Sequence, residues 1–390
     1  MPDLPFPIEE YRDRARRVRE EMARRGVDVL YVMSPANILY LSGFESIWYP
    51  PRAPLGVVLT TADERLTFLD YVRHETLVET TAHFDDAVYF DYADAVETVV
   101  GAFRTKGWTQ GAVGIERYTK SPAGPLVERM ASALADAGAE VVSGDWVVDR
   151  VRLVKSPAEL ERVRRASEIV DAAFEALHDY IRPGRTELQI SAFLTLAMAD
   201  LGGEEAALRP MVSAGPEVWC RTHAAPSRRP VEDGDVMYVD ACGVVDRYHV
   251  DVCRTLAIGR DHPAAREVLE YTTQSVEKVV AGVRPGDPLD VAQRIAEEHV
   301  FARYDRDTVW WVGGYALGIA LPPDWVGHTY LSNDAYEPFT WEPGYVTNYE
   351  NIVFDRAGGY TASYMETLLM TPNGIGILSR VPRTLQVVET

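Results

Sequence analysis

The chain has 390 residues, of which 47% are hydrophobic and 25% charged, and its formal net charge is −20. This length predicts two domains with a sizeable core, and the composition is typical of a soluble globular protein. Because a strongly acidic surface repels phosphate backbones, we expect no binding to nucleic acid.

The sequence carries no recognisable export or membrane signal. The N-terminal segment has no apolar stretch of the kind found in signal peptides, and no run of about 18 apolar residues exists. Cys220, Cys242 and Cys253 form no CxxC pair and are odd in number. Such cysteine usage disfavours a disulfide framework and fits a reducing compartment, so we expect a cytoplasmic protein.

The first 150 residues alternate between helical and strand patterns. Apolar side chains at positions 8, 11, 15, 18 and 22 form one stripe of a helix that ends at Gly26. Further helices are predicted near 95–106 and 122–137, and strands at 27–33, 56–61, 65–70 and 112–116. The alternation predicts an α/β domain with a mostly buried sheet.

A second region begins near Leu153. Ser156 is the predicted N-cap of a long helix, and Thr186 with Gln189 forms a capping box for the next one. Strands with hairpins are predicted at about 210–258, and helices at about 263–281 and 288–303. We expect one domain at 1–153 and a second at 154–390.

Two predicted hairpins each carry a pair of acids. Asp240 and Asp251 are equidistant from a centre between Val245 and Asp246, so a regular hairpin would place them directly opposite each other. Glu350 and Glu366 are likewise equidistant from Gly358, so they too are expected to face each other. Opposed like charges are unfavourable unless a cation lies between them. The alternative is that some of these acids are solvated edge charges.

Other side chains have two interpretations each. His223 lies in a loop and is either a proton shuttle or an ordinary surface histidine. His249 shares a strand face with Asp251 and is either support for the site or a core residue. Cys242 and Cys253 are candidate nucleophiles or, more simply, small buried hydrophobic residues. Aromatic residues crowd the C-terminal part, as core packing, an oligomer contact or a cage for a cationic ligand. They are Trp310, Trp311, Trp325, Tyr330, Tyr336, Phe339, Trp341, Tyr345 and Tyr349.

These motifs, in this order, resemble the pita-bread superfamily of creatinase, prolidase and aminopeptidase P. The series contains His223, Asp240, Asp251 with Arg254–Thr255, Gly314–Gly318, Glu350 and Glu366. Segments Lys155–Leu160 and Ser34–Phe44 resemble the inter-domain marker and the N-terminal domain of the family. The resemblance covers essentially the whole chain. It implies an N-terminal α/β domain followed by an α+β pita-bread catalytic domain.

The resemblance implies a divalent metal (Mn, Fe or Zn) bound by Asp240, Asp251, Glu350 and Glu366. Carboxylate ligands favour hard ions, whereas zinc normally takes nitrogen or sulfur as well. Tyr315 stands where the family has a ligand histidine, and a neutral tyrosine is a poor ligand. Because of this tyrosine, we expect one ion, weakly held ions or none. Creatinase itself works without metal, so by this resemblance the loss of metal does not mean the loss of enzyme activity.

The loop around Tyr315 resembles that of ectoine-hydrolase-like members. This implies a substrate contacted by Asp324, Trp325, His328, His249 and Arg254, with His223, Glu350, Glu366 and Tyr315 as catalytic residues. We expect a metal-dependent hydrolase that cleaves a non-peptide C–N bond, an amide or amidine, in a small polar or zwitterionic molecule. The alternatives are a lyase that eliminates a sulfonium or amine group, an Xaa-Pro peptidase and a non-catalytic binding protein. The resemblance also implies a homodimer.

Overall fold

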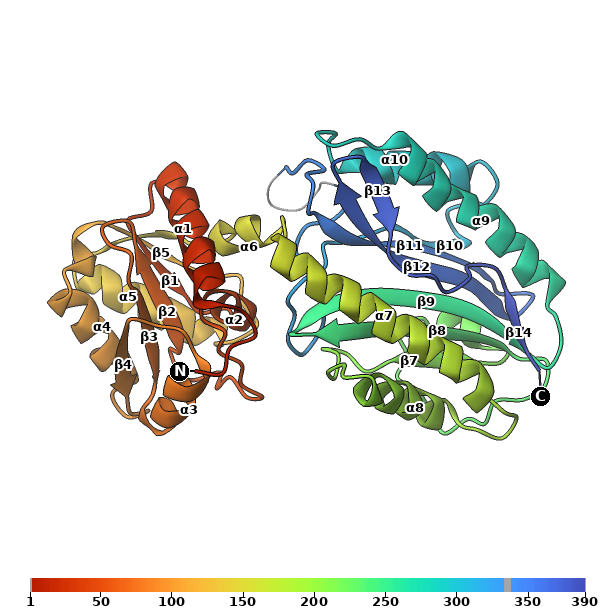
Figure 1. The fold of residues 1–390 in the computed structure, drawn as a ribbon, viewed down its shortest axis with the longest axis horizontal. Coiled ribbons are helices and arrows are strands. Elements are labelled where there is room, and N and C mark those ends of the chain that lie inside the picture. The colour runs from red at the N-terminus through yellow and green to blue at the C-terminus, as the bar shows by residue number, and fades with distance from the viewer. Residues whose placement is uncertain (1, 333–337, 390) are drawn as a thin grey trace. The chain divides into compact units, whose positions relative to one another are not determined.

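The computed structural model describes residues 2–332 and 338–389. These residues form two compact units, Met1–Arg152 and Leu153–Thr390, which are considered separately below (Figure 1). In the described part of the chain, no helix combines the length and the apolar character needed to cross a membrane.

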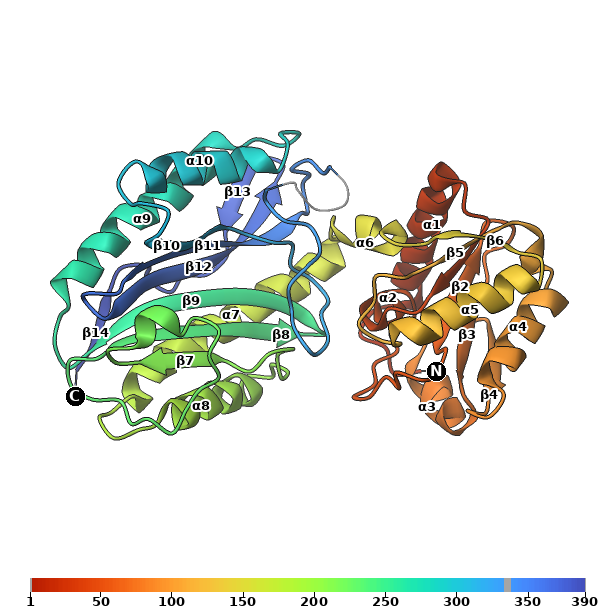
Figure 2. The ribbon, with the colours of Figure 1, turned by 180° about the vertical axis from the view of Figure 1, so that it is seen from behind.

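The N-terminal unit is a mixed six-stranded sheet in the order β4-β3-β2-β1-β5-β6. Its strands are β1 (Val29–Val32), β2 (Gly56–Thr60), β3 (Leu66–Tyr71), β4 (Asp86–Phe90), β5 (Ala112–Ile115) and β6 (Glu140–Ser143). Its helices are α1 (Ile8–Arg25), α2 (Pro35–Ser42), α3 (Glu75–Thr81), α4 (Ala95–Thr105), α5 (Gly124–Asp136) and α6 (Val147–Arg152). Helices α4 and α5 cover one face of the sheet, and α1 and α2 cover the other (Figures 1 and 2).

Helix α1 shows how the sequence dictates this packing. The predicted stripe is confirmed, because Tyr11, Ala15, Val18 and Met22 are all buried. Gly26 ends the helix in the left-handed conformation, with φ of 69°, which costs glycine little. The α/β class predicted for this region is therefore confirmed.

The second unit is built on an eight-stranded sheet whose main path runs β10-β11-β12-β9-β8-β7. These strands are β7 (Met211–Ala214), β8 (Val236–Val245), β9 (Tyr248–Ile258), β10 (Val309–Gly313), β11 (Val346–Asp355) and β12 (Tyr360–Thr371). Two further strands pair at its margins, β13 (Gly374–Ile377) with β12 and β14 (Gln386–Val388) with β9.

Four helices accompany this sheet: α7 (Pro157–Tyr180), α8 (Glu187–Asp200), α9 (Pro263–Gly282) and α10 (Asp290–Phe301). Both predicted capping boxes are present, at Ser156–Glu159 for α7 and at Thr186–Gln189 for α8. Helix α7 crosses β8 and β9, while α9 runs beside β11 and β12 (Figure 1). One face of the sheet is therefore covered by helices, and we call the opposite one the inner face.

Candidate active site

The first acid-bearing hairpin turns one residue later than its sequence symmetry predicts. Val245 pairs with Tyr248, so the loop consists of Asp246 and Arg247 alone. Both loop residues have positive φ, 48° and 64°, as a two-residue turn that matches strand twist requires. The hairpin centre is therefore between these two residues.

This turn makes the expected direct pairing of Asp240 with Asp251 wrong. Asp240 pairs with Cys253, and Asp251 pairs with Cys242. Opposed residues on antiparallel strands share a face, and so do residues two apart on one strand. The two aspartates are consequently diagonal neighbours on the same face of the sheet, and the hairpin still brings them together.

The second hairpin departs from expectation in a more consequential way. Glu350 of β11 pairs with Met365 of β12, whereas Glu366 pairs with Tyr349. A slip of one residue reverses the face on which a side chain lies. Glu350 and Glu366 therefore lie on opposite faces of the sheet, and the expectation that they face each other is wrong.

The helices show which face is which. The hydroxyl groups of Tyr349 and Tyr364 lie 2.7 and 3.0 Å from the Ser275 hydroxyl of α9. Glu366 belongs to the same face, because it pairs with Tyr349 and lies two residues from Tyr364. That is the helix-covered face. Asp240, Asp251 and Glu350 share the inner face, and we call these three residues the acid cluster.

Asn348 joins two members of the acid cluster. Its side-chain amide donates to Asp251 Oδ2 at 3.1 Å and to Glu350 Oε1 at 2.6 Å. Asp240 Oδ2 accepts a hydrogen bond from the Tyr238 hydroxyl at 2.9 Å. The remaining oxygens, Asp240 Oδ1 and Asp251 Oδ1, are buried without a hydrogen-bond partner among the described residues. Sequence reasoning missed Asn348, although its position two residues before Glu350 places it on the same strand face.

The electrostatics of the acid cluster are unusual. Asp240, Asp251 and Glu350 are 1%, 0% and 6% exposed, and within the described residues no basic side chain forms an ion pair with them. Burial, reinforced by Asp251 and Glu350, raises the pKa of Asp240 well above its usual range. Burial and the Asp251 charge raise the pKa of Glu350 to about 8. Such a site favours a bound cation or a proton.

Tyr315 borders the cluster and is held by two contacts. Its backbone N–H donates to Asn348 Oδ1 at 2.7 Å, and its hydroxyl accepts from the indole N–H of Trp325 at 3.1 Å. Burial and the charges of Glu350 and Asp251 raise the pKa of the Tyr315 phenol well above its usual value. The phenol therefore stays protonated and can donate its hydroxyl hydrogen to a ligand.

His249 is a core residue, so its expected contact with substrate is not supported. Its Nδ1 lies 2.8 Å from the Arg247 carbonyl oxygen, and its Nε2 lies 3.0 Å from the Ala207 backbone nitrogen. A carbonyl accepts and a backbone N–H donates, so the ring is neutral with its hydrogen on Nδ1. Burial lowers the pKa of His249 to about 3, which agrees with this assignment. The imidazole packs against Trp325, with ring centres 6.4 Å apart.

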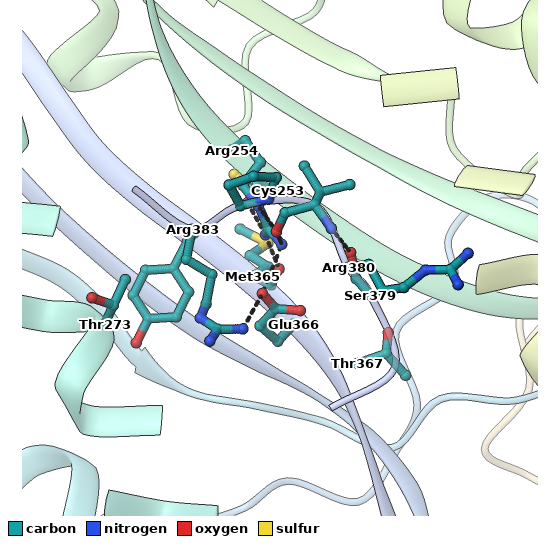
Figure 3. A network of polar contacts seen from close by, with 12 residues as sticks. Cys253, Arg254, Thr273, Met365, Glu366, Thr367, Ser379, Arg380 and Arg383 are labelled. Carbon is teal, nitrogen blue, oxygen red and sulfur yellow. Dashed lines mark hydrogen bonds and ion pairs between the residues drawn. The ribbon is translucent and has the colours of Figure 1, made fainter. Parts of the chain in front are cut away.

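Arg254 and Glu366 belong to the opposite face and form a buried ion pair there (Figure 3). Arg254 donates to Glu366 Oε1 at 2.7 Å. Its other hydrogen bonds are donated to the carbonyl oxygens of Cys253, Met365 and Val381. Arg383 lies 3.5 Å from the same Glu366 oxygen. Neither the predicted substrate contact of Arg254 nor the predicted place of Glu366 in the acid cluster agrees with this geometry.

His223 is exposed and lies apart from these contacts. Its ring packs edge-on against Trp310, with centres 4.7 Å apart. Its loop is anchored by Glu187, which is fully buried and binds both terminal nitrogens of Arg221 at 3.0 and 3.1 Å. Ser227 N–H adds a third bond to this carboxylate at 2.8 Å. The structure thus fixes the loop of His223 without placing the imidazole against the acid cluster.

The remaining candidates divide between the loop after β10 and the core. Asp324 and His328 are half-buried on the loop that carries Trp325, and Asp324 Oδ1 accepts from Val326 N–H at 3.2 Å. Cys242 and Cys253 are fully buried, and burial raises the pKa of both thiols well above the usual value, so neither is a nucleophile. Of the aromatic residues, Trp325, Phe339, Trp341, Tyr345 and Tyr349 are buried, Trp310 is exposed, Trp311 and Tyr330 are intermediate, and Tyr336 lies outside the described residues.

The donor set does not fit the four-carboxylate metal site that the resemblance implies. Within residues 2–332 and 338–389, no group of three or more His, Cys, Asp or Glu side chains is arranged to hold a metal ion. Glu366 is committed to arginine on the other face, and Tyr315 stands in place of a histidine. Three carboxylates remain on the inner face, with neither the fourth acid nor a nitrogen ligand.

Two sequence families match the chain. Residues 14–154 match the Creatinase/Prolidase N-terminal domain, and residues 161–372, more than half of the chain, match Metallopeptidase family M24. The chain belongs to metallopeptidase family M24. The name of this family denotes metal-dependent peptidases. The family and the relatives described next place the chain among hydrolases.

Relatives of known name extend over the whole chain. The ectoine hydrolase of Halomonas elongata is 26% identical over 98% of this chain and 98% of its own length. The Xaa-Pro dipeptidase of Pyrococcus furiosus is 23% identical over 96% of this chain and 99% of its own. These values identify the family without selecting one reaction within it.

Solved structures confirm the pita-bread fold. A prolidase from Thermococcus sibiricus superposes with a TM-score of 0.84 at 20% identity, covering 97% of this chain and 99% of that one. An X-Pro aminopeptidase from Thermotoga maritima MSB8 superposes with a TM-score of 0.82 at 21% identity, covering 96% and 99%. The fold class and the family resemblance expected from the sequence are therefore confirmed.

Proposed function

We propose that this chain is a hydrolase that cleaves a non-peptide C–N bond, an amide or amidine, in a small polar or zwitterionic molecule. The observation that carries the proposal is the acid cluster, whose unpartnered oxygens on Asp240 and Asp251 lie near the protonated hydroxyl of Tyr315. A site with buried negative charge and no basic partner favours a ligand that brings its own positive charge. The full-length similarity to an ectoine hydrolase supports the same class of substrate.

Three residues of the site can each take a separate role in this reaction. Glu350, the most exposed of the three acids, takes a proton from water as the water oxygen attacks the amide or amidine carbon. Tyr315 donates a hydrogen bond to the charge that develops on the attacked group, and Trp325 holds its hydroxyl in place. The C–N bond then breaks, the nitrogen takes up a proton, and the carbon keeps the water oxygen. A divalent metal forms no part of this scheme, because the donor set does not fit one.

Isotope labelling in H2¹⁸O tests the reaction. The probes are a cyclic amidine zwitterion, a guanidino acid, a sulfonium carboxylate and an Xaa-Pro dipeptide. We expect hydrolysis of one of the first two, with one ¹⁸O atom in the carbonyl product. An alkene without ¹⁸O identifies a lyase instead, and turnover of the dipeptide alone identifies the peptidase suggested by the Pyrococcus relative. Binding without turnover of any probe contradicts an enzymatic role.

We also propose that the protein acts in the cytoplasm as a homodimer. The N-terminal unit exposes Ile47 (107%) and Trp48 (56%), two large apolar side chains on one loop. Apolar side chains so exposed favour burial against another copy of the chain. Light scattering should give twice the 43.5 kDa mass of the chain, and Trp48→Glu should shift this mass toward one copy. An unshifted mass of 43.5 kDa for the unaltered protein contradicts the proposal.

A further inference from the structure

Met365 occupies the position that a fourth inner-face acid would need. It pairs with Glu350 on β11 and with Cys253 on β9, and Cys253 in turn pairs with Asp240 on β8. Strand β12 lies between β11 and β9, so these four residues form one row across the sheet. Opposed residues share a face, so Met365 lies between Glu350 and Asp240 on the inner face.

The acid that follows Met365 in sequence is not available to the row. Glu366 lies on the helix-covered face, where Arg254 binds it at 2.7 Å and Arg383 lies at 3.5 Å (Figure 3). All of the Arg254 guanidinium nitrogens are engaged, and both Arg254 and Glu366 are almost fully buried. Rotating Glu366 toward the inner face would leave a buried arginine without its counter-charge, which is strongly unfavourable.

Methionine and a carboxylate at position 365 differ in how they bind metal ions. A thioether is neutral and soft, whereas hard divalent ions are held by several oxygen ligands. Met365 therefore leaves the inner face with three carboxylates where a fourth would complete an all-oxygen set. The adjoining Cys242 and Cys253 do not supply a fourth oxygen ligand, because both are fully buried and sulfur is a soft donor.

We infer that Met365 determines whether the inner face of this chain binds a divalent metal ion. With methionine at position 365 the inner face does not retain a divalent ion, and Met365→Glu creates a site for one. The inference rests on strand register and donor chemistry alone. It therefore holds or fails independently of which bond the protein cleaves.

Mn²⁺ titration by calorimetry, with thermal unfolding in parallel, tests the inference on the full-length chain. The unaltered protein should bind no stoichiometric Mn²⁺ in the micromolar range. Met365→Glu should bind about one ion per chain, and Mn²⁺ at a hundredfold excess over its Kd should raise its Tm by about 5 °C or more. Met365→Gln, which has the shape of glutamate without its charge, should bind none.

Glu366→Gln separates this inference from the alternative in which Glu366 is a ligand. We expect no difference in Mn²⁺ binding between this variant and the unaltered protein, neither of which should bind the ion in the micromolar range. Micromolar binding by the unaltered protein that is lost in Glu366→Gln overturns the inference. If Met365→Glu does not fold without metal, recovery of its folded circular dichroism on adding Mn²⁺ supports the inference, and failure to recover contradicts it.

Discussion

The indole N–H of Trp325 donates a hydrogen bond of 3.1 Å to the hydroxyl oxygen of Tyr315. The bond occupies a lone pair of the phenol, whose own hydrogen interacts with the carboxyl groups of Asp251 and Glu350 and can turn from them toward a ligand. Burial and the nearby acids keep the phenol protonated. Tyr315 is therefore poised as a donor, whose orientation is set by a residue ten positions later.

Removal of this hydroxyl should slow the reaction without unfolding the protein. We expect Tyr315→Phe to lower kcat by about a hundredfold, the effect of losing one donor to developing charge. Trp325→Phe should lower kcat less, because the hydroxyl remains and only its orientation is lost. Steady-state kinetics on the substrate found by the labelling experiment measure both effects. Unchanged kcat in Tyr315→Phe would show that the phenol is only a wall of the site.

The two glutamates of the β11–β12 hairpin should respond to the same substitution in opposite directions. Above pH 8, where Glu350 is ionised, Glu350→Gln removes a charge from a crowded acid cluster and should raise the free energy of unfolding by about 1 kcal/mol while abolishing activity. Glu366→Gln breaks a buried ion pair and should lower it by about 3 kcal/mol. Urea unfolding compares the two variants directly. Destabilisation of both to the same extent would contradict the placement of Glu350 in a repulsive cluster.

Substitution of His223 should affect activity, whereas substitution of His249 should affect stability. His223 is exposed, so His223→Ala should leave Tm unchanged, and we expect kcat to fall about a hundredfold if the imidazole is the proton shuttle predicted from the sequence. His249→Ala should instead lower Tm, because it leaves the buried Ala207 N–H and Arg247 carbonyl without their hydrogen bonds to the imidazole. Full activity in His223→Ala, with turnover intact, removes this histidine from the reaction. The Tm measurements control for unfolding in both variants.

The acid–base behaviour of Glu116 can be tested within the N-terminal unit alone. Burial and the charge of Asp149 raise the pKa of Glu116 to about 8, although it accepts bonds from Met33 and Ser34 N–H at 2.7 and 2.6 Å. The folded state then holds a proton that the unfolded state releases above its ordinary value of 4.5. Its stabilising contribution is complete below pH 4.5 and is lost as the pH rises toward 8.

Glu116→Gln should remove this dependence. Calorimetry at pH 6 and pH 8.5 should show a larger drop of Tm in the unaltered protein than in the variant, by the several degrees that roughly 2–3 kcal/mol produces, because each pH unit up to the pKa of about 8 is worth about 1.4 kcal/mol. Equal drops would indicate that Glu116 is ionised in the folded state throughout. Asp149→Asn is a useful companion, because it removes the neighbouring charge and should lower the pKa of Glu116.

Much of the architecture follows from local sequence signals. The stripe of α1 and the capping boxes of α7 and α8 were predictable because each depends on residues within one helix. The short elements α2, α3, β4 and β6 were not predicted. Their stability comes from the sheet and helices around them, since segments of this length carry little intrinsic preference.

The pairing of the acids could be predicted only in part. Identifying both hairpins required turn residues and alternation, but their registers depended on how many residues each turn contains. A turn of Asp246 and Arg247 kept Asp240 and Asp251 on one face, whereas the β11–β12 turn moved Glu366 to the other. Sequence symmetry locates a hairpin centre to about one residue, whereas a shift of the centre by about half a residue slips the register by one residue and moves a side chain to the other face.

The contacts of Arg254 with the Val381 carbonyl also bear on the order in which the second unit folds. Val381 lies 127 positions after Arg254 in the chain, and β14, which follows Val381, pairs with β9. Contacts between segments so far apart in sequence require closure of a long loop, so these contacts should be among the later ones to form during folding. A protein shortened before Val381 would retain a buried guanidinium with fewer acceptors.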